Sequence, residues 1–217
     1  EGAVVRSVAA APDGTISGGT AFPMRQFCLD PTSDTLVNRP AYGQWNTVAP
    51  RGDRFFVGGY PGGFLLEWDP SKPWVYTDVK RSDSNPRFLM QYEHVYRPHR
   101  LLALQDDSMV IMGGTPEYGA TGGGLLFWDR KKQSGVELKD TDIIPNQSTM
   151  SQVYVTGGKL LGGTTTAPGT GGEKKATEAE LYIMDLASKK IEWHAAVFPG
   201  VQNYSDMCDG RGGLVYG

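Results

Sequence analysis

The sequence is poor in cysteine and contains no long apolar run. Its two cysteines, Cys28 and Cys208, lie far apart and both fall in predicted strands, where we expect small buried side chains. A disulfide between them is the alternative, and two cysteines do not decide the redox compartment. No segment approaches the roughly 18 consecutive apolar residues that a membrane-spanning helix needs. We therefore predict no membrane span and leave the cellular compartment open.

Clustered positive charge is also scarce. Lys and Arg together number 21 against 24 Asp and Glu, which gives a formal net charge of -3. A face that binds nucleic acid needs clustered Lys and Arg. The only compact basic run covers residues 130–132, directly after a predicted strand, and is typical of a solvated turn. We therefore predict no nucleic-acid partner.

Glycine and proline, by contrast, are abundant. The chain has 29 Gly and 14 Pro, which occur in short clusters between apolar segments. Such clusters mark tight turns between short strands, and this pattern predicts an all-β protein. With 39% hydrophobic residues over 217 positions, the chain is long enough and apolar enough to form a buried core.

A Gly-Gly step followed by an apolar segment that ends in Asp occurs four times. Internal repeats of this kind outrank other sequence signals when a fold is assigned. The Asp falls where a turn should follow the third strand of each unit, and Asp suits tight turns. The copies are Gly18-Gly19 with Phe27-Cys28-Leu29-Asp30, Gly58-Gly59 with Leu66-Glu67-Trp68-Asp69, Gly113-Gly114 with Leu126-Phe127-Trp128-Asp129, and Gly162-Gly163 with Tyr182-Ile183-Met184-Asp185.

Each copy is flanked by further predicted strands, which gives units of four short strands at a spacing of about 40 to 55 residues. These units resemble the blades of a β-propeller, and the resemblance covers the whole chain. The Trp-Asp pairs lack the spacing of WD40 repeats, and the Gly pairs lack the aromatic spacing of kelch repeats, so no family within the superfamily is matched. A β-sandwich is the alternative fold, but it would not need the same Gly-Gly step four times.

The resemblance implies a single β-propeller domain over residues 1–217. In the second blade we expect the fourth strand at residues 74–79 and a polar linker at 80–87. Propellers close into rings of typically four to eight blades, and an open ring exposes apolar faces and strand edges. We therefore expect the remainder of the ring to come from missing sequence or from another chain. The predicted blades cover approximately residues 4–40, 45–80, 99–140 and 149–198, and the first half of a fifth covers 202–217.

Propellers commonly bind ligands at the mouth of the central channel. The resemblance implies that the start of each innermost strand and the loop between the second and third strands emerge on that face. Counting back 13 residues from the first Gly of a step selects one side chain per blade, with one residue more in the third blade because its turn is longer. The structural alternative is that such side chains simply fill the pore. These positions and their next neighbours supply six candidate ligand-binding residues: Trp45, Asn46, His99, Arg100, Thr149 and Tyr204.

Three of these candidates suggest a chemistry. His99, Arg100 and Tyr204 are the residue types used by propeller polysaccharide lyases, in which a His or Tyr is the base and an Arg neutralises a uronate carboxylate. The leading hypothesis is nevertheless a module that binds a small molecule, a glycan or a protein partner without catalysis, since a fold alone implies no activity. The alternatives are part of a propeller lyase or hydrolase acting on acidic glycans, or a purely structural segment. For an anionic ligand we expect Arg100 to be the main electrostatic contact.

Other motifs were weighed for cofactors and metals. The Gly-rich stretch 119–124 lacks the Lys-Ser/Thr of a phosphate-binding loop and precedes a strand. His94 and His99, with Glu93, could gather a metal ion, but Pro98 disfavours a helix that would space them regularly. We therefore predict no cofactor and no metal site. The longest predicted loop, residues 164–178, lies on the candidate face, where binding residues concentrate.

Overall fold

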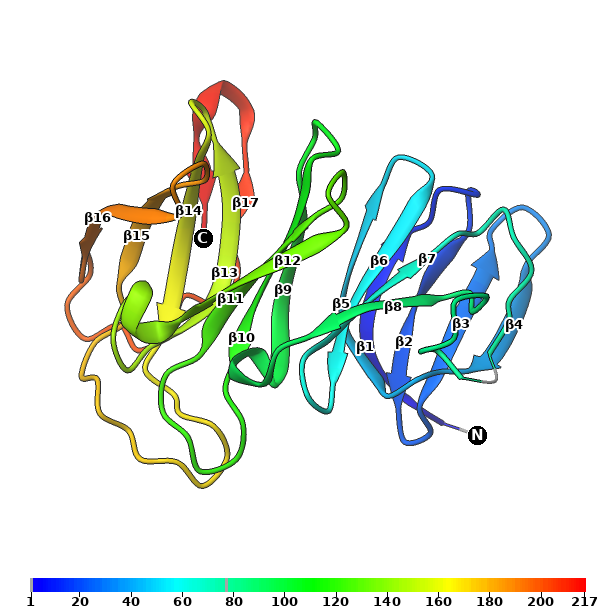
Figure 1. The fold of residues 1–217 in the computed structure, drawn as a ribbon, viewed down its shortest axis with the longest axis horizontal. Helices are drawn as coiled ribbons and strands as arrows, with labels where there is room; N and C mark the ends of the chain where they lie inside the picture. The colour runs from blue at the N-terminus through cyan, green and yellow to red at the C-terminus, as the bar shows by residue number, and fades with distance from the viewer. Residues whose placement is uncertain (1, 77) are drawn as a thin grey trace.

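The structure is a computed structural model that describes residues 2–76 and 78–217, and it is built from short antiparallel β-strands (Figure 1). Four sheets have four strands each, in the order in which the strands occur in the chain, as expected for propeller blades. We refer to them as blades one to four. Within the described residues, no helix is both long and apolar enough to cross a membrane.

The strands of the first two blades are as follows. Blade one consists of β1 (Val4–Ala10), β2 (Ile16–Ala21), β3 (Arg25–Asp30) and β4 (Thr35–Pro40), and blade two of β5 (Gln44–Arg51), β6 (Arg54–Tyr60), β7 (Phe64–Trp68) and β8 (Arg87–Gln91).

The remaining elements complete two further blades and a strand pair. Blade three consists of β9 (Arg97–Ala103), β10 (Met109–Thr115), β11 (Gly124–Asp129) and β12 (Ser134–Lys139), and blade four of β13 (Ser148–Val155), β14 (Lys159–Thr165), β15 (Leu181–Asp185) and β16 (Lys190–Ala195). The half-blade is the pair β17 (Cys208–Asp209) and β18 (Val215–Tyr216), and the short helical turns are η1 (Glu93–Val95), η2 (Asp140–Asp142) and η3 (Arg211–Gly213).

The fourth strand of blade two corrects one expectation. Residues 74–76 and 78–79 do not form it, and residue 77 of the expected strand lies outside the described residues. β8 forms the fourth strand, so this blade extends to Gln91 rather than ending near residue 80. The segment between β7 and β8, the excursion of blade two, is closed by the side-chain amide of Asn85. This amide donates to the backbone oxygens of Asp69, Lys72 and Pro73 at 2.9, 3.2 and 3.0 Å. These bonds satisfy backbone acceptors without a strand partner. The apolar run therefore folds back as a closed loop.

Trp74 shows what that excursion contributes. Its ring lies 6.0 Å from the rings of both Trp45 and Trp68, and the guanidinium of Arg39 in blade one lies 5.3 Å from its centre. The aromatic residue that suggested a strand instead covers the junction between blades one and two. Aromatic side chains bury large areas and favour such packing over an exposed strand position.

The repeated Asp closes the turn after each third strand. Its side-chain oxygen accepts a hydrogen bond from a backbone N–H two or three residues further on, which is the Asx turn that Asp favours. In blade one, hydroxyl groups also donate to this carboxylate: bonds from the Thr32 hydroxyl first and the Ser33 hydroxyl second lower the pKa of Asp30 to about 2. The backbone bonds run from Thr32 to Asp30 at 2.8 Å, Ser71 to Asp69 at 3.1 Å, Lys132 to Asp129 at 2.8 Å and Ser188 to Asp185 at 2.8 Å.

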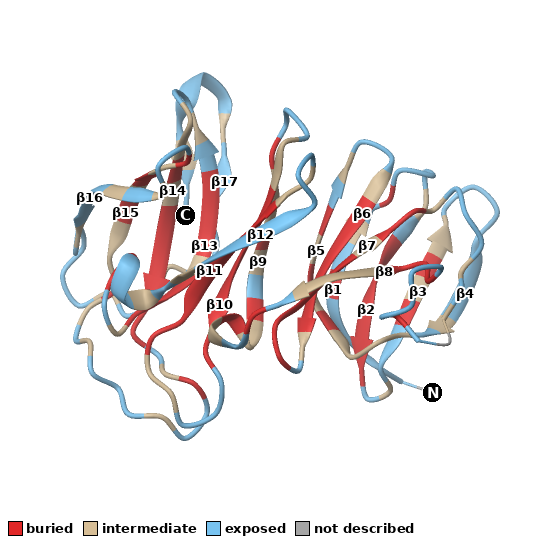
Figure 2. Ribbon diagram, in the orientation of Figure 1, coloured by how far each residue is buried: buried red, intermediate tan, exposed pale blue. Residues whose placement is uncertain are grey.

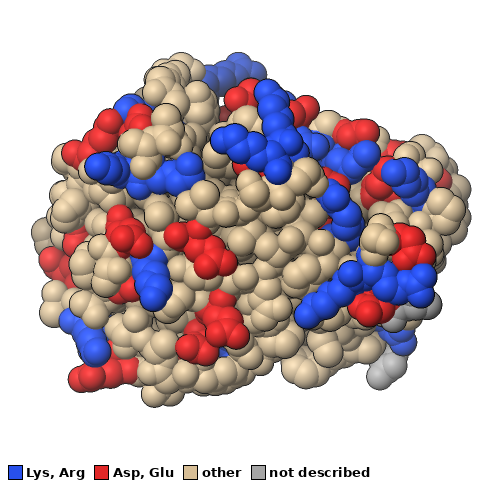
Figure 3. All heavy atoms as spheres, in the orientation of Figure 1, with Lys and Arg blue, Asp and Glu red and all other residues tan. Residues whose placement is uncertain are grey.

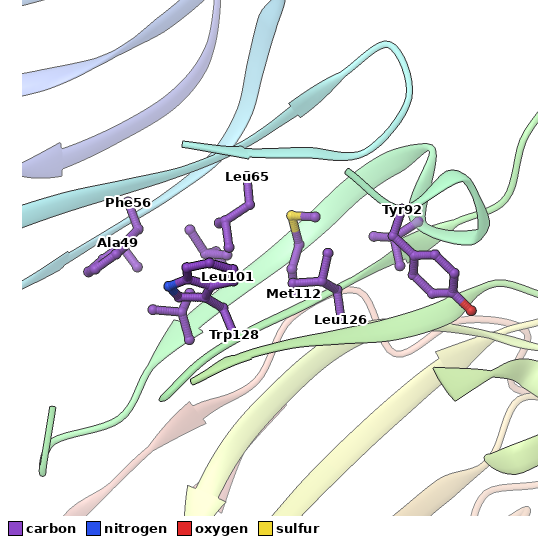
Figure 4. Close-up of a cluster of buried hydrophobic side chains, with 10 residues drawn as sticks. Ala49, Phe56, Leu65, Tyr92, Leu101, Met112, Leu126 and Trp128 are labelled. Carbon is purple, nitrogen blue, oxygen red and sulfur yellow. The ribbon is translucent and has the colours of Figure 1, made fainter. Parts of the chain in front are cut away.

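Apolar side chains pack between neighbouring blades rather than in one central core. Figure 4 shows the cluster between blades two and three, where Phe56 and Leu65 meet Leu126 and Trp128. Trp68 fills the equivalent position between blades one and two. Trp68 and Trp128 are 3% and 6% exposed, so each is buried between two blades.

The Gly-Gly steps lie at the middle of β2 and in the second halves of β6, β10 and β14. A Cβ on Gly19 would collide with Trp45 of the next blade, and one on Gly163 would meet Tyr204. A strand glycine often marks such a close approach of neighbouring structure. The repeated steps therefore let the innermost strand of the following blade pack closely.

Blade one keeps an apolar face that no blade covers. Val8 and Ile16 are 58% and 36% exposed, whereas Leu101 and Val110, at the same register positions of blade three, are 4% and 0% exposed. The outermost strand β4 is also mostly exposed, as Figure 2 shows at its right-hand end. The sheets thus form part of a ring, with one inter-blade surface open.

The two cysteines are both free, and only one matches its expected environment. Cys28 is buried against blade two, but Cys208 is exposed in the half-blade, because only β18 pairs with its short strand.

Acidic and basic side chains are interspersed on the face shown in Figure 3.

Candidate ligand-binding cleft

A cleft of about 530 Å³ opens where β9 and β13 meet the segment after β14. Hydroxyl and amide side chains line much of it, together with one imidazole, one ammonium group and a few apolar side chains. Convergent polar groups in a concave, partly apolar setting are typical of small-molecule sites. The lining residues are His99, Thr115, Met150, Thr165, Thr166, Ala167, Pro168, Lys174, Gln202 and Asn203.

A second pocket of about 570 Å³ lies beside the excursion of blade two, but its charges already have partners. Asp69 pairs with Arg54 at 3.3 Å and with Lys72 at 3.2 Å, and Arg87 pairs with Glu67 at 3.0 Å. A ligand would have to separate these ion pairs, whereas the hydroxyl and amide groups that line the cleft at blades three and four can exchange hydrogen bonds at a smaller cost. The cleft at blades three and four is therefore the stronger candidate.

The loop after β14 supplies one wall of the cleft, and it is paired with the loop after β10; Figure 1 shows the two loops projecting together at the lower left. They are residues 116–123, after β10, and residues 166–180, after β14. The N–H of Gly119 donates to the oxygen of Thr170 at 3.0 Å, and the N–H of Gly169 donates to that of Ala120 at 3.0 Å. The Thr121 hydroxyl adds a bond of 2.6 Å to the oxygen of Glu173. These bonds tie the paired loops into one unit.

His99 is the sequence-predicted candidate that lines the cleft. Its Nε2 lies 3.2 Å from the hydroxyl oxygen of Thr115. The ring is open to solvent on one side, yet crowding by the walls and then the charge of Arg97 lower the pKa of His99 to about 4. The imidazole is thus neutral at pH 7 and can both donate and accept a hydrogen bond.

The position of His99 within its blade differs from the one assigned by counting residues back from the Gly-Gly step. It is the extra residue at a β-bulge, between Pro98 and Arg100, which pair with Gly114 and Gly113. The same bulge in blade two skips Asn46. His99 therefore corresponds to Asn46 and not to Trp45, because a bulge adds one residue to one strand and makes residue counting fail.

Trp45 and Thr149 do not reach the cleft. Trp45 is fully buried between blades one and two. Thr149 is 2% exposed, and its hydroxyl lies 2.9 Å from that of Tyr182, within blade four. Both side chains are packing elements here, so the structure gives their assignment as ligand contacts no support.

Arg100, Tyr204 and Asn46 are likewise engaged elsewhere. Arg100 forms an ion pair with Asp206 at 3.0 Å and donates to the oxygen of Met207 at 3.1 Å. The Tyr204 ring packs on the Gly163 step with its hydroxyl enclosed. Asn46 accepts a bond of 2.6 Å from Gln44. The fold therefore does not bring the six sequence candidates together.

The cleft depends instead on residues that sequence reasoning missed. Thr165, Thr166 and Lys174 lie in the loop of residues 164–178 that the sequence placed on the candidate face, but they were not chosen as candidates one by one. Thr115 directly follows a Gly-Gly step, which was the available signal for it. Gln202 joins the walls: its Oε1 accepts from the hydroxyl of Thr166 at 3.1 Å and also from the Lys174 ammonium. No local pattern marks Gln202, because its partners lie far away in sequence.

Comparison with known proteins supports the fold. No family model matches, and no curated protein matches. Among solved structures, the Cps50 (Swd1) β-propeller domain of Myceliophteria thermophila matches with a TM-score of 0.63 at 12% identity, covering 94% of this chain and 58% of that one. The Dos1 propeller matches with a TM-score of 0.63 at 14% identity, covering 98% and 52%. The extracellular domain of a B. thetaiotaomicron protein described as a hybrid two component system gives 0.60 at 16%, covering 98% and 25%.

These similarities establish a β-propeller fold, all-β and with blades of four antiparallel strands. At such low identity they carry no activity or partner over to this chain. The chain spans less than two thirds of each matched chain, in keeping with a ring whose sheets are not closed.

Proposed function

We propose that this chain is a β-propeller binding module that holds a hydroxyl-rich small molecule, of the saccharide class, in the cleft between blades three and four. The observation that carries the proposal is the lining, in which the hydroxyls of Thr115, Thr165 and Thr166 meet the amides of Gln202 and Asn203. Hydroxyl and amide groups both donate and accept hydrogen bonds, as sugar hydroxyls require. The lining therefore suits the hydroxyl groups of a sugar.

Apolar groups support the same ligand class. Met150, Ala167 and Pro168 share the cleft with the polar side chains. A sugar ring presents C–H groups on its faces and hydroxyls at its edge, so it needs both kinds of surface. The neutral imidazole of His99 adds a donor and an acceptor without the cost of burying a charge.

Catalysis receives less support than binding. A lyase acting on uronates needs a base and a cation that neutralises the carboxylate. His99 is neutral at pH 7 and could accept a proton, but Arg100 is paired with Asp206 and the Tyr204 hydroxyl is enclosed. The triad of residue types that suggested a lyase is therefore not assembled. The binding module is the function favoured here.

A binding screen tests this function. Titration calorimetry with a panel of neutral and acidic tetrasaccharides should find at least one ligand for the 217-residue chain. His99→Ala should weaken that affinity about tenfold, as expected for the loss of a direct hydrogen bond and its contact. The matched control is His94→Ala, in η1, whose ring contacts Tyr92 and does not line the cleft; it should bind like the unmodified chain. Equal affinity of all three proteins would remove the cleft from the site, and no binding across the panel would refute the ligand class.

We also propose that further blades cover the open face of blade one. At this face Val8, Ile16, Phe27 and Leu29 take the register positions that are fully packed in blade three. An inter-blade surface of the same composition favours the same kind of partner, another blade. The ring would be completed by sequence outside this chain or by another chain.

A further inference from the structure

Arg97 lies in a box of three tyrosines beside the cleft. Its guanidinium carbon is 4.9 Å from the ring centre of Tyr60 and 5.1 Å from that of Tyr118, and its Nη2 donates to the Tyr118 hydroxyl at 2.7 Å. Tyr96 packs edge-on at 5.5 Å from Tyr60 and 5.7 Å from Tyr118. Stacking between aromatic faces holds the planar guanidinium in a fixed orientation. The ammonium group of a lysine is not planar and would not be oriented in this way.

The tyrosine hydroxyls complete the box. Those of Tyr60 and Tyr118 are 2.6 Å apart. Bonding to Tyr60, and then to Arg97, lowers the pKa of Tyr118, whereas the same bond raises the pKa of Tyr60. Either hydroxyl can donate to the other, and the Tyr118 oxygen also accepts from Arg97. The hydrogen bonds of the box thus form among Arg97, Tyr60 and Tyr118.

No ion pair neutralises the charge of Arg97 in the part of the chain that the structure describes. Among the described residues, no carboxylate lies within ion-pair distance of it, and the Tyr118 hydroxyl is the one acceptor that its side chain is seen to use. Its remaining N–H groups are available for a ligand, and an arginine presents five donors in a planar fork. A half-buried, stacked guanidinium with unused donors is a suitable partner for a two-oxygen anion.

Arg97 is not among the residues that line the cleft, but its neighbours in the sheet are. It pairs in the sheet with Thr115, which lines the cleft, and His99 follows it by two residues on the same strand. The positive charge of Arg97 helps to lower the pKa of His99, because it disfavours the protonated imidazole. Lys174 is the one residue with a formal charge among the described residues that line the cleft, and it is also positive. The surroundings of the cleft therefore favour an anion.

We infer that Arg97, and not Arg100, is the anion contact of this cleft, and that the ligand is a saccharide carrying a carboxylate, a uronic acid. The inference rests on the proposed saccharide-binding function and narrows it. The hydroxyl and amide side chains would hold the sugar hydroxyls, while the fork of Arg97 pairs with the carboxylate through two N–H groups. The tyrosine box keeps the guanidinium oriented before the ligand arrives, which reduces the entropy lost on binding.

A matched pair of probes tests the inference. Titration calorimetry compares tetragalacturonate with its fully methyl-esterified form, which keeps the sugar rings but lacks the charge. The unmodified chain should bind the acid about ten- to a hundredfold more tightly than the ester, the expected range for charge-assisted hydrogen bonds. Arg97→Gln should remove this preference and leave the affinity for the ester unchanged. Arg97→Lys should restore only part of it, because Lys acts as a point charge.

Controls separate the outcomes. Arg25→Gln, which removes an exposed charge from blade one, should bind both probes like the unmodified chain. Circular dichroism should show that Arg97→Gln keeps the β-structure and melting temperature of the parent. If the unmodified chain binds acid and ester equally, or if Arg97→Gln keeps the preference, the inference is overturned while the saccharide function stands. If neither probe binds but another saccharide of the panel does, the inference fails while the saccharide function stands. If no saccharide of the panel binds, both fail.

Discussion

Arg100 and Asp206 are 106 residues apart in sequence, yet their side chains form an ion pair of 3.0 Å. Arg100 lies on the innermost strand of blade three, and Asp206 lies in the segment that leads into the half-blade. The same guanidinium donates to the oxygen of Met207. This contact joins two parts of the ring that are not consecutive blades. It also occupies the residue that the sequence suggested for a ligand carboxylate.

Arg100→Ala should therefore reduce stability and leave saccharide affinity unchanged. The pair is partly exposed, so the ion pair contributes about 0–1 kcal/mol. The bond to the Met207 oxygen adds about 1 kcal/mol, which gives a loss of about 1–2 kcal/mol in the free energy of unfolding. Urea denaturation of Arg100→Ala, Asp206→Ala and the double variant measures the coupling. Strictly additive effects would show that the two side chains do not interact in solution.

The repeat made most of the architecture predictable. Gly-Gly steps and the following Asp residues locate the second strands and the turns after the third strands, because close blade packing and Asx turns demand those residues. The excursion of blade two was not predictable in the same way. Trp74 has the apolar neighbours of a strand residue, and only the contacts with Trp45, Trp68 and Arg39, distant in sequence, show that it covers a junction.

The candidate cleft was less predictable than the fold, for a physical reason. Residue counting assumes that every innermost strand has the same number of residues before its Gly-Gly step, and β-bulges break that assumption. His99 was identified, but with Trp45 as its supposed counterpart. Arg97 was missed because its significance comes from Tyr60 and Tyr118, which other strands and loops supply. A single sequence holds no signal for such contacts between residues that are distant along the chain.

Inter-blade packing predicts a contrast between Trp128 and Leu29, which share a register position. Trp128→Ala should cost about 3–5 kcal/mol, since it empties a buried aromatic position between blades two and three. Leu29→Ala should cost only about 1 kcal/mol in this chain, because no blade covers that face and less apolar area is lost. Chemical denaturation of both variants gives the comparison. Equal costs would mean that blade one is covered in solution.

The open face of blade one should make the chain self-associate. Ile16→Ser and Val8→Thr each remove apolar surface from it and should lower the weight-average mass seen by sedimentation at equal concentration. Val136→Thr, on the outer strand β12, is the matched control, since Val136 is 47% exposed but lies away from this face. A chain that is monomeric at high concentration, with or without these changes, would contradict the expectation.

His99 should make stability depend on pH below neutrality. Its pKa is about 4 in the folded chain, against an ordinary value of 6.5, because its surroundings and Arg97 disfavour the imidazolium. Between these two values the unfolded chain binds more protons than the folded one, so the free energy of unfolding falls as pH is lowered from about 6.5 to about 4 and is unaffected by this group above that window. The ring is partly open to solvent, so the slope should be modest.

Urea denaturation of the parent and of His99→Gln at several pH values measures this slope. The variant should lose less stability across the window from about pH 6.5 to about pH 4. In the parent, the NMR shift of the His99 ring should stay constant from pH 8 to pH 6, and a titration centred near pH 6.5 would contradict the prediction.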